Sequence, residues 1–307
     1  MKLKDLLYVL ISLVIILIVL TGCVNGGNPT STKDDVVFSD GTLERLIREA
    51  IGQPEATINP EKLENLTRLD LRGWFIQDLT GLEYCKKLEY LNLSENKITD
   101  ISALTGMLRM KELFLTNNDI SDISPLSSMA ELTVLSLMNN PVSDISPLAG
   151  CTSITKLYLW DNQISDVSPL AGMTRLTEIS LSMNQIEDIS SLSSLVNLKE
   201  LGLKSNSISS LSGIEMMVNL THIDAAENQI TDITPLVNLE NLVWVDLSSN
   251  EISDLGLWSR YIPAEDQSLT IIIRDNPLSD ISLSTYIPVM RDNGLTIEWQ
   301  SLVDRVK

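Results

Sequence analysis

The most regular feature of the chain is an apolar pattern that repeats every 22 residues. In each copy an apolar residue is followed by two more, three and five positions on, as Leu88 is followed by Leu91 and Leu93. This alternation predicts a short strand with one buried face. The constant period predicts that successive strands stack in parallel and in register. The nine copies begin at Leu66, Leu88, Met110, Leu132, Ile154, Leu176, Leu198, Leu220 and Leu242.

An asparagine column lies eight residues into the copies, and only Trp74 in the first copy departs from it. An amide side chain carries two donors and an acceptor, so stacked asparagines can satisfy backbone groups where the chain turns away from the sheet. The pattern therefore predicts a structural asparagine ladder. Its members are Asn96, Asn118, Asn140, Asn162, Asn184, Asn206, Asn228 and Asn250.

Two further polar columns follow the asparagines. A Ser or Thr lies fourteen residues into the copies, and in some copies a proline follows it, as in Ser124-Pro125. Ser at the N-cap with Pro at the first helical position predicts a short helical turn opposite the sheet. The other column is aspartate, twelve residues in. It can be interpreted as a cation-binding ladder or as turn chemistry, and turn chemistry is favoured. Its members are Asp78, Asp100, Asp122, Asp144, Asp166, Asp188, Asp232 and Asp254.

The motif LxxLxLxxN, seen in LEYLNLSEN from Leu88, resembles the leucine-rich repeat, and the SDISPL segment at 121–126 is similar to bacterial internalin-type repeats. The resemblance implies an α/β fold: a right-handed, curved solenoid with a parallel sheet on the concave side. It also implies short 3₁₀ turns or loops on the convex side and a helical cap before the repeats. Known members bind proteins through the concave face. The concave positions of this chain to which the resemblance points are Tyr90, Phe114, Tyr158, Trp160 and Trp244.

The ends of the repeat array differ from its middle. The segment 39–52 places apolar residues at helical spacing, with Asp40 or Thr42 available as N-cap and Gly52 as terminator. We expect this helix to cover the first repeat. The apolar positions are Leu43, Leu46, Ile47, Ala50 and Ile51. The expected organisation is a signal peptide at 1–22, a flexible linker at 23–35, a helical cap at 36–65, nine repeats at 66–267, and an irregular repeat with a C-terminal cap at 268–307.

The N-terminus carries a pattern typical of export. A short positive end, MKLK, precedes an apolar run at 6–20, and LTGC follows, ending at Cys23. LTGC resembles the lipobox of bacterial lipoproteins. The resemblance implies that Cys23 is acylated, which would tether an extracytoplasmic protein to a membrane. An uncleaved membrane helix is the alternative, although its apolar run is short of the roughly 20 residues that a span needs.

The concave face follows from the repeat. Residues two, four and six positions into each copy point away from the core, and this set holds five aromatic and two aliphatic side chains. We expect several of them to form an exposed apolar patch that binds a ligand. Cross-strand stacking for sheet stability is the alternative. The concave candidates are Tyr90, Phe114, Val134, Met138, Tyr158, Trp160, His222 and Trp244, with an acidic flank at Glu178, Glu200, Asp224 and Asp246.

Charge and composition narrow the function. The formal net charge is −19, which argues against nucleic acid and favours a basic partner. His222 is the single histidine and stands near Asp224, but no nucleophile accompanies it, so we expect neither catalysis nor a metal or other cofactor. Cys85 and Cys151 are three repeats apart, about 14 Å at the strand spacing, which is too far for a disulfide.

The leading hypothesis is a membrane-tethered, extracytoplasmic, non-catalytic protein that binds a protein ligand on its concave face as a monomer. Two alternatives stay open. The first is a structural or assembly role in the cell envelope through self-association of the same face. The second is glycan binding, because aromatic side chains can stack on sugars.

Overall fold

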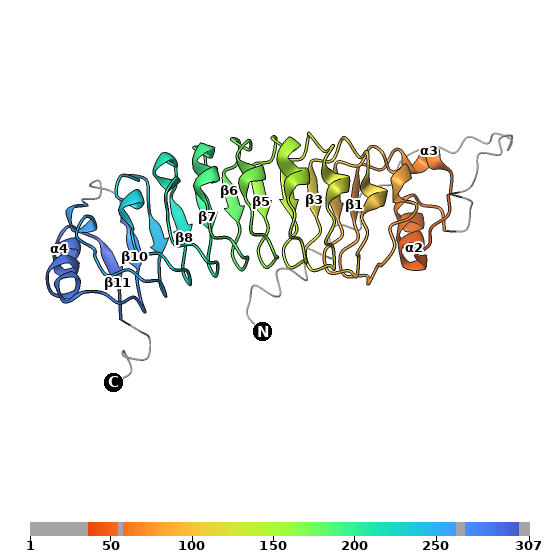
Figure 1. The fold of residues 1–307 in the computed structure, drawn as a ribbon. Coiled ribbons are helices and arrows are strands. Elements are labelled where there is room, and N and C mark those ends of the chain that lie inside the picture. Colours follow the sequence, from red (N-terminus) through yellow and green to blue (C-terminus); the bar gives the residue numbers. More distant parts are fainter. Residues whose placement is uncertain (1–35, 55–57, 262–267, 301–307) are drawn as a thin grey trace, which may run out of the picture. The chain divides into compact units, whose positions relative to one another are not determined.

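The computed structural model describes residues 36–54, 58–261 and 268–300. In these residues, eleven parallel strands form one sheet whose strand order follows the chain (Figure 1). Each turn of chain therefore adds one strand beside the last, and the expected leucine-rich-repeat solenoid with a parallel sheet is confirmed. The strands are β1 (Arg68–Asp70), β2 (Tyr90–Asn92), β3 (Glu112–Phe114), β4 (Val134–Ser136), β5 (Lys156–Tyr158), β6 (Glu178–Ser180), β7 (Glu200–Gly202), β8 (His222–Asp224), β9 (Trp244–Asp246), β10 (Thr270–Ile272) and β11 (Thr296–Glu298).

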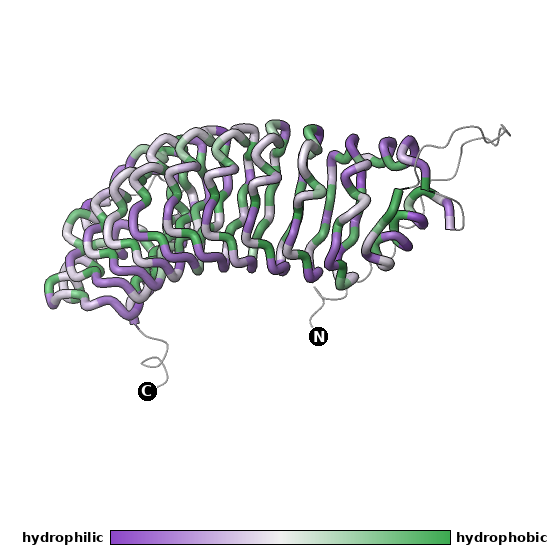
Figure 2. The backbone as a smooth tube through the Cα atoms, turned by 45° about the vertical axis from the view of Figure 1, so that its right-hand side comes forward, coloured by the Kyte–Doolittle hydropathy of each residue, from purple (hydrophilic) through white to green (hydrophobic). Residues whose placement is uncertain are grey.

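The side of each turn opposite the sheet is built from short helical turns. They are η1 (Leu82–Tyr84), η2 (Ser102–Leu104), η3 (Ser124–Leu126), η4 (Ser146–Gly150), η5 (Ser168–Leu170), η6 (Ser190–Ser194), η7 (Ile214–Met216), η8 (Thr234–Leu236) and η9 (Trp258–Arg260). In the repeats, each strand has three residues and each helical turn three to five, and loops join them. Figure 2 shows hydrophobic and hydrophilic stretches alternating within every turn of the solenoid.

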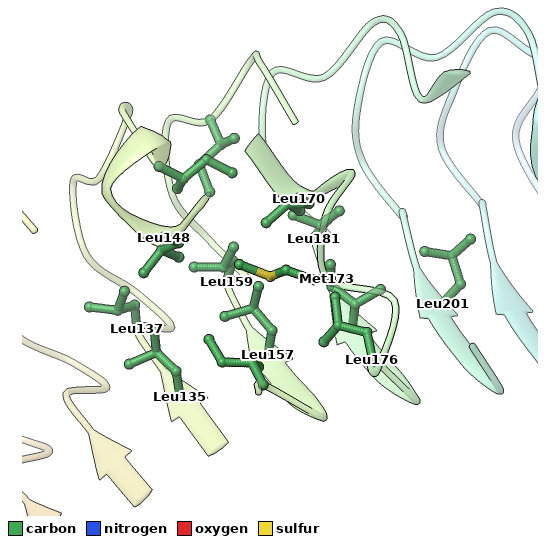
Figure 3. Close-up of a cluster of buried hydrophobic side chains, with 14 of the residues drawn as sticks. Leu135, Leu137, Leu148, Leu157, Leu159, Leu170, Met173, Leu176, Leu181 and Leu201 are labelled. Carbon is green, nitrogen blue, oxygen red and sulfur yellow. The ribbon is translucent and has the colours of Figure 1, made fainter. Parts of the chain in front are cut away.

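The core consists of apolar side chains that occupy equivalent positions in successive turns of the solenoid. Leu157 at the centre of β5 and Leu159 just after it are fully buried, and their counterparts in neighbouring turns, such as Leu135 and Leu137, point into the same interior (Figure 3). Burying one leucine side chain contributes roughly 1.5–3 kcal/mol. No single turn can bury these side chains alone, so each turn depends on its neighbours for stability.

The asparagine column ties successive turns together. Asn140 Nδ2 donates to the carbonyl oxygens of Leu115, Leu137 and Met138 at 3.0–3.2 Å. Its Oδ1 accepts the backbone N–H of Ile120 from the preceding turn at 3.0 Å. The other seven asparagines bond in the same way, and Asn276 extends the ladder into the turn of β10. Each amide thus uses both donors and its acceptor inside the wall of the solenoid.

The aspartate column closes the turns that precede the helical segments. Asp144 Oδ1 accepts the backbone N–H of Ser146 at 2.8 Å, and the other seven aspartates bond in the same way to the residue two positions on. The serine was therefore wrongly predicted as N-cap. The N-cap position is an apolar residue, Ile145 in this copy, without a side-chain cap. The aspartate supplies the acceptor from one residue further back because the 3₁₀ turn begins at Ser146 itself.

A cap covers the first repeat. Helix α2 (Gly41–Ala50) buries Leu43 and Ile47, while Ala50 is exposed. Asp40 is its N-cap and accepts from Thr42 and Leu43 through Oδ1. Asp40 Oδ2 also accepts the N–H of Gln77 at 2.9 Å, which fixes the helix to the first repeat. Burial raises the pKa of Asp40, but these backbone N–H groups outweigh it and hold the pKa below its ordinary value.

The remaining elements complete the two ends. Helix α3 (Pro60–Leu63) precedes β1, and its N-cap Asn59 accepts from Glu61. At the other end a π-helical turn, η10 (Ser282–Tyr286), runs into α4 (Ile287–Asp292) before β11 (Figure 1).

Cys85 and Cys151 are buried free thiols, as the repeat spacing predicts, and burial raises the pKa of Cys85 to about 12.

The expected signal peptide at 1–22, the linker at 23–35 and the acylated Cys23 lie outside the described residues. In the described part of the chain, no helix combines the length and apolarity needed to cross a membrane.

Candidate ligand-binding face

Strand register arranges the concave side chains in three rows. The first row runs Tyr90, Glu112, Val134, Lys156 and on through Glu178, Glu200, His222 and Trp244. The middle row holds Phe114, Ser136 and Tyr158 in its first half, and Gly202, Asp224 and Asp246 in its second. Met138 and Trp160 stand in the third row, two residues beyond β4 and β5. The predicted ligand-binding residues thus divide into two groups at different places along the sheet.

The first group, which we call the central patch, spans β2–β5 and comprises Tyr90, Phe114, Val134, Met138, Tyr158 and Trp160. All six side chains are half-buried, so less of the patch is exposed than expected from the sequence. Neighbouring concave side chains cover them in part. The guanidinium of Arg68 lies 3.4 Å from the ring centroid of Tyr90, and Ser136, between Phe114 and Tyr158, is itself buried. The patch therefore presents only part of the surface of each side chain.

Tyr158 joins the central patch to the acidic flank. Its hydroxyl donates to Glu178 Oε1 at 2.8 Å, and Lys156 Nζ lies 2.8 Å from Glu178 Oε2. Burial, then the hydrogen bond to Glu178 and the charges of Glu178 and Glu200, raise the pKa of Tyr158 well above its ordinary value. Glu178 likewise raises the pKa of Lys156. The tyrosine is thus held neutral and its ring fixed in place, which lowers the entropy that a binding partner would have to remove.

The other end of the central patch has a pocket of its own. The rings of Tyr90 and Phe114 lie 5.6 Å apart, centroid to centroid, at 48°. Beside them is a hollow of about 300 Å³ lined also by Arg72, Asn92 and Glu95. Arg72 and Glu95 form an ion pair at 2.6 Å on its rim. Aromatic surface is therefore combined here with hydrogen-bonding side chains.

The acidic flank surrounds a second hollow, which we call the Gly202 hollow. It measures about 210 Å³ and is lined by Glu178, Ile179, Ser180, Glu200, Leu201, Gly202, His222, Asp224 and Trp244. Trp244 lines this hollow and is remote from the central patch. Sequence reasoning missed the hollow, although its signal is visible: Gly202 is the one glycine among the concave positions of the nine copies.

His222 lies near the carboxylates of the acidic flank without a hydrogen bond to any of them. His222 is exposed, and its Nδ1 lies 2.9 Å from the hydroxyl of Thr221. Burial, and after it the neighbouring charge of Asp246, raise the pKa of Asp224. Within the described residues, no group of three or more His, Cys, Asp or Glu side chains is placed to hold a metal ion.

Comparison with known proteins identifies the family to which the chain belongs. The model of the family described as leucine-rich repeats (two copies) matches residues 61–106, 109–150, 152–194 and 196–238, together more than half of the chain. The chain belongs to the leucine-rich repeat family. Leucine-rich repeats commonly serve as protein-interaction scaffolds that present an extended concave surface. A sequence comparison with curated proteins finds no significant match.

Several solved leucine-rich repeat structures resemble this one. An internalin (InlF) of Listeria monocytogenes is 28% identical at a TM-score of 0.61, with 90% of this chain and 96% of that chain covered. Internalin C2 of the same organism is 31% identical at a TM-score of 0.65, covering 69% and 95%. The plant peptide hormone receptor RGFR1, solved in complex with RGF2, is 18% identical at a TM-score of 0.56, covering 72% and 41%. The protein is therefore internalin-like, and the likeness to the plant receptor concerns the fold alone.

Proposed function

We propose that this leucine-rich repeat protein is tethered to a membrane outside the cytoplasm and binds a protein ligand on its concave face without catalysing a reaction. The observation that carries the proposal is the central patch. Six apolar side chains from four adjacent strands share one face, and polar networks at both ends hold their rings in place. Half-buried, pre-positioned Tyr and Trp side chains are the type that dominates binding energy at protein interfaces.

Charge supports the same proposal. The net charge of −19 and the acidic flank beside the patch complement a basic ligand. Complementary charge raises the association rate and selects partners, while the apolar anchor supplies affinity. Binding should therefore weaken as ionic strength rises, without vanishing.

An affinity capture tests concave binding. The full-length protein and a Tyr158→Ala/Trp160→Ala variant are immobilised and exposed to envelope extracts and to host extracts. A Leu108→Ala/Met216→Ala variant is the matched control, because both of those side chains are exposed outside the sheet. Equal urea midpoints establish that the variants fold. A protein retained by the wild type and the control but lost from the concave variant supports the proposal, and equal retention by all three contradicts it.

The membrane anchor is a separate part of the proposal. It is supported by the MKLK end, the apolar run at 6–20 and the LTGC segment ending at Cys23. Two acyl chains anchor a protein stably, whereas one does not. Metabolic labelling with a radioactive fatty acid tests it: the wild type should carry label and a Cys23→Ala variant should not. Label retained by the variant would contradict acylation at this residue.

Glycan binding is the second candidate, favoured by the hollow beside Tyr90 and Phe114. This hollow offers ring surface together with Arg72, Asn92 and Glu95, the combination that holds sugar rings and hydroxyl groups. Binding of a saccharide that is insensitive to salt and lost in Phe114→Ala would favour this candidate over a basic protein ligand. The internalin likeness supports protein binding instead, so the glycan stays second.

A further inference from the structure

The Gly202 hollow has an open floor. Gly202 stands in the middle row between Ser180 on β6 and Asp224 on β8. A Cβ at this position would lie 3.2 Å from Ser182 Oγ, which already accepts the N–H of Lys204. A side chain here would therefore require Ser182 to shift by a few tenths of an ångström. Glycine inside a strand often marks the place where another group approaches the backbone closely.

The walls of the hollow carry more carboxylates than cations. Glu178 is paired with Lys156. Lys204 pairs with Glu227 at 3.1 Å outside the hollow, and its charge offsets only part of that of Asp224 and Asp246. In the described part of the chain, Glu200 and Asp224 have no ion pair. Asp246 stands directly beside Asp224 in the middle row and adds to the same negative field. A cation placed between these carboxylates would relieve their repulsion.

The remaining wall is aromatic. Trp244 is half-buried and stands beside His222 in the first row, on the side of the hollow away from Glu178. An indole is the strongest aromatic partner for a cation. The chain itself uses this contact elsewhere: the guanidinium of Arg291 lies 4.1 Å from the ring centroid of Trp299, and that of Arg45 lies 5.0 Å from Trp74.

We propose that the Gly202 hollow receives the guanidinium of an arginine side chain of the protein ligand, stacked against Trp244 and bonded to Glu200 and Asp224. Guanidinium is planar and carries five N–H donors, so it can stack on an indole and bond to carboxylates at the same time. The compact ammonium of lysine has no planar surface with which to stack on the indole. This inference rests on concave protein binding as the function and adds the chemistry of one contact.

Nuclear magnetic resonance of the tryptophan indole groups tests the inference on the full-length protein. The chain has five tryptophans, and a Trp244→Phe variant identifies the Trp244 signal by its disappearance. The probes are the peptide acetyl-Gly-Arg-Gly-amide and its citrulline counterpart, which has nearly the same shape without the charge. The arginine peptide should shift the Trp244 signal until the shift saturates. The citrulline peptide should bind at least about tenfold more weakly.

Two variants localise the contact. Glu200→Gln keeps the side-chain size and removes a charge from the hollow, so it should weaken the arginine peptide about tenfold. Glu240→Gln removes an exposed carboxylate in the turn between η8 and β9, outside the hollow, and should leave binding unchanged. The inference is overturned if Trp244 does not respond, if citrulline binds equally, or if Glu200→Gln has no effect. If it is overturned while Tyr158→Ala/Trp160→Ala still abolishes capture, concave binding stands and only the arginine assignment is lost.

Discussion

Asn140 Oδ1 accepts the backbone N–H of Ile120 at 3.0 Å, across the boundary between two turns of the solenoid. The acceptor and the N–H are 20 residues apart in the chain, and the same bond recurs at every later asparagine of the column. The backbone of each turn is therefore completed by a side chain of the next. This contact keeps the repeats regular, because it fixes the position at which the backbone turns away after each strand.

Replacing Asn140 by Ala should lower the free energy of unfolding by roughly 1–3 kcal/mol, since Asn140 is buried and its loss leaves several backbone groups without a partner. Urea unfolding followed by circular dichroism measures the change. Asn219→Ala is the control: this exposed asparagine makes one bond, to the carbonyl of Val196, and its loss should cost less than about 0.5 kcal/mol. Equal effects of the two variants would contradict a structural ladder.

A second prediction concerns the backbone at Met183. Its φ is +55°, a left-handed conformation that this column otherwise gives mostly to Asn, Asp, Ser and Glu, and its side chain is 42% exposed. Asparagine tolerates this conformation better than methionine, so Met183→Asn should stabilise the protein by about 1 kcal/mol. Met216 is exposed but has no positive φ, and Met216→Asn should bring no gain. A thermal midpoint that fails to rise for Met183→Asn would refute the argument.

Tyr158 predicts a stability change at high pH. Its pKa is raised in the folded protein by burial and by Glu178, above the ordinary value of 10.0 that it regains on unfolding. The folded state therefore holds its proton where the unfolded state loses it. The resulting stability is complete below pH 10 and is lost as pH rises beyond it. Urea midpoints measured between pH 8 and 11 should fall more steeply for the wild type than for Tyr158→Phe, and parallel curves would contradict the shift.

The aspartate column predicts the opposite dependence in acid. Backbone and side-chain hydrogen bonds from Ser146 hold the pKa of Asp144 below its ordinary value of 3.8. Its contribution is present above that value and is lost as pH falls through the lowered pKa. Asp144→Asn keeps an oxygen acceptor for Ser146 and should flatten the acid dependence, whereas Asp144→Ala should also destabilise the protein at neutral pH. Urea midpoints at pH 2–7 would show whether the two variants differ in this way.

Much of the fold can be predicted from the sequence because each position of the repeat has the same structural role in every copy. The period of 22 residues places the centre of each strand, and the buried leucines and bonded asparagines follow from it. The serine at position 146 misled, because Ser-Pro is a common helix start. The competing acceptor two residues earlier, Asp144, is recognised only when the turn geometry is known.

The site was less predictable, because it depends on contacts between rows rather than on columns. The sequence predicts that Tyr90 and Trp244 lie on the concave face. It does not predict that Arg68 covers Tyr90, or that Trp244, four strands from the central patch, borders a hollow. The conformation and exposure of Phe75 could not be predicted from the sequence either. It adopts a φ of +58° while 73% exposed, and the first copy departs from the asparagine column just beside it, at Trp74.

Site-specific crosslinking in living cells is the most direct test of concave binding. A photoreactive benzoylphenylalanine replaces Glu112, an exposed concave residue of β3 that stands between Tyr90 and Val134, or Ser128, an exposed residue on the side of η3. The account predicts a covalent adduct with a second protein from position 112 and none from position 128. An adduct from position 128 alone, equal crosslinking at both positions, or no adduct from position 112 would contradict it.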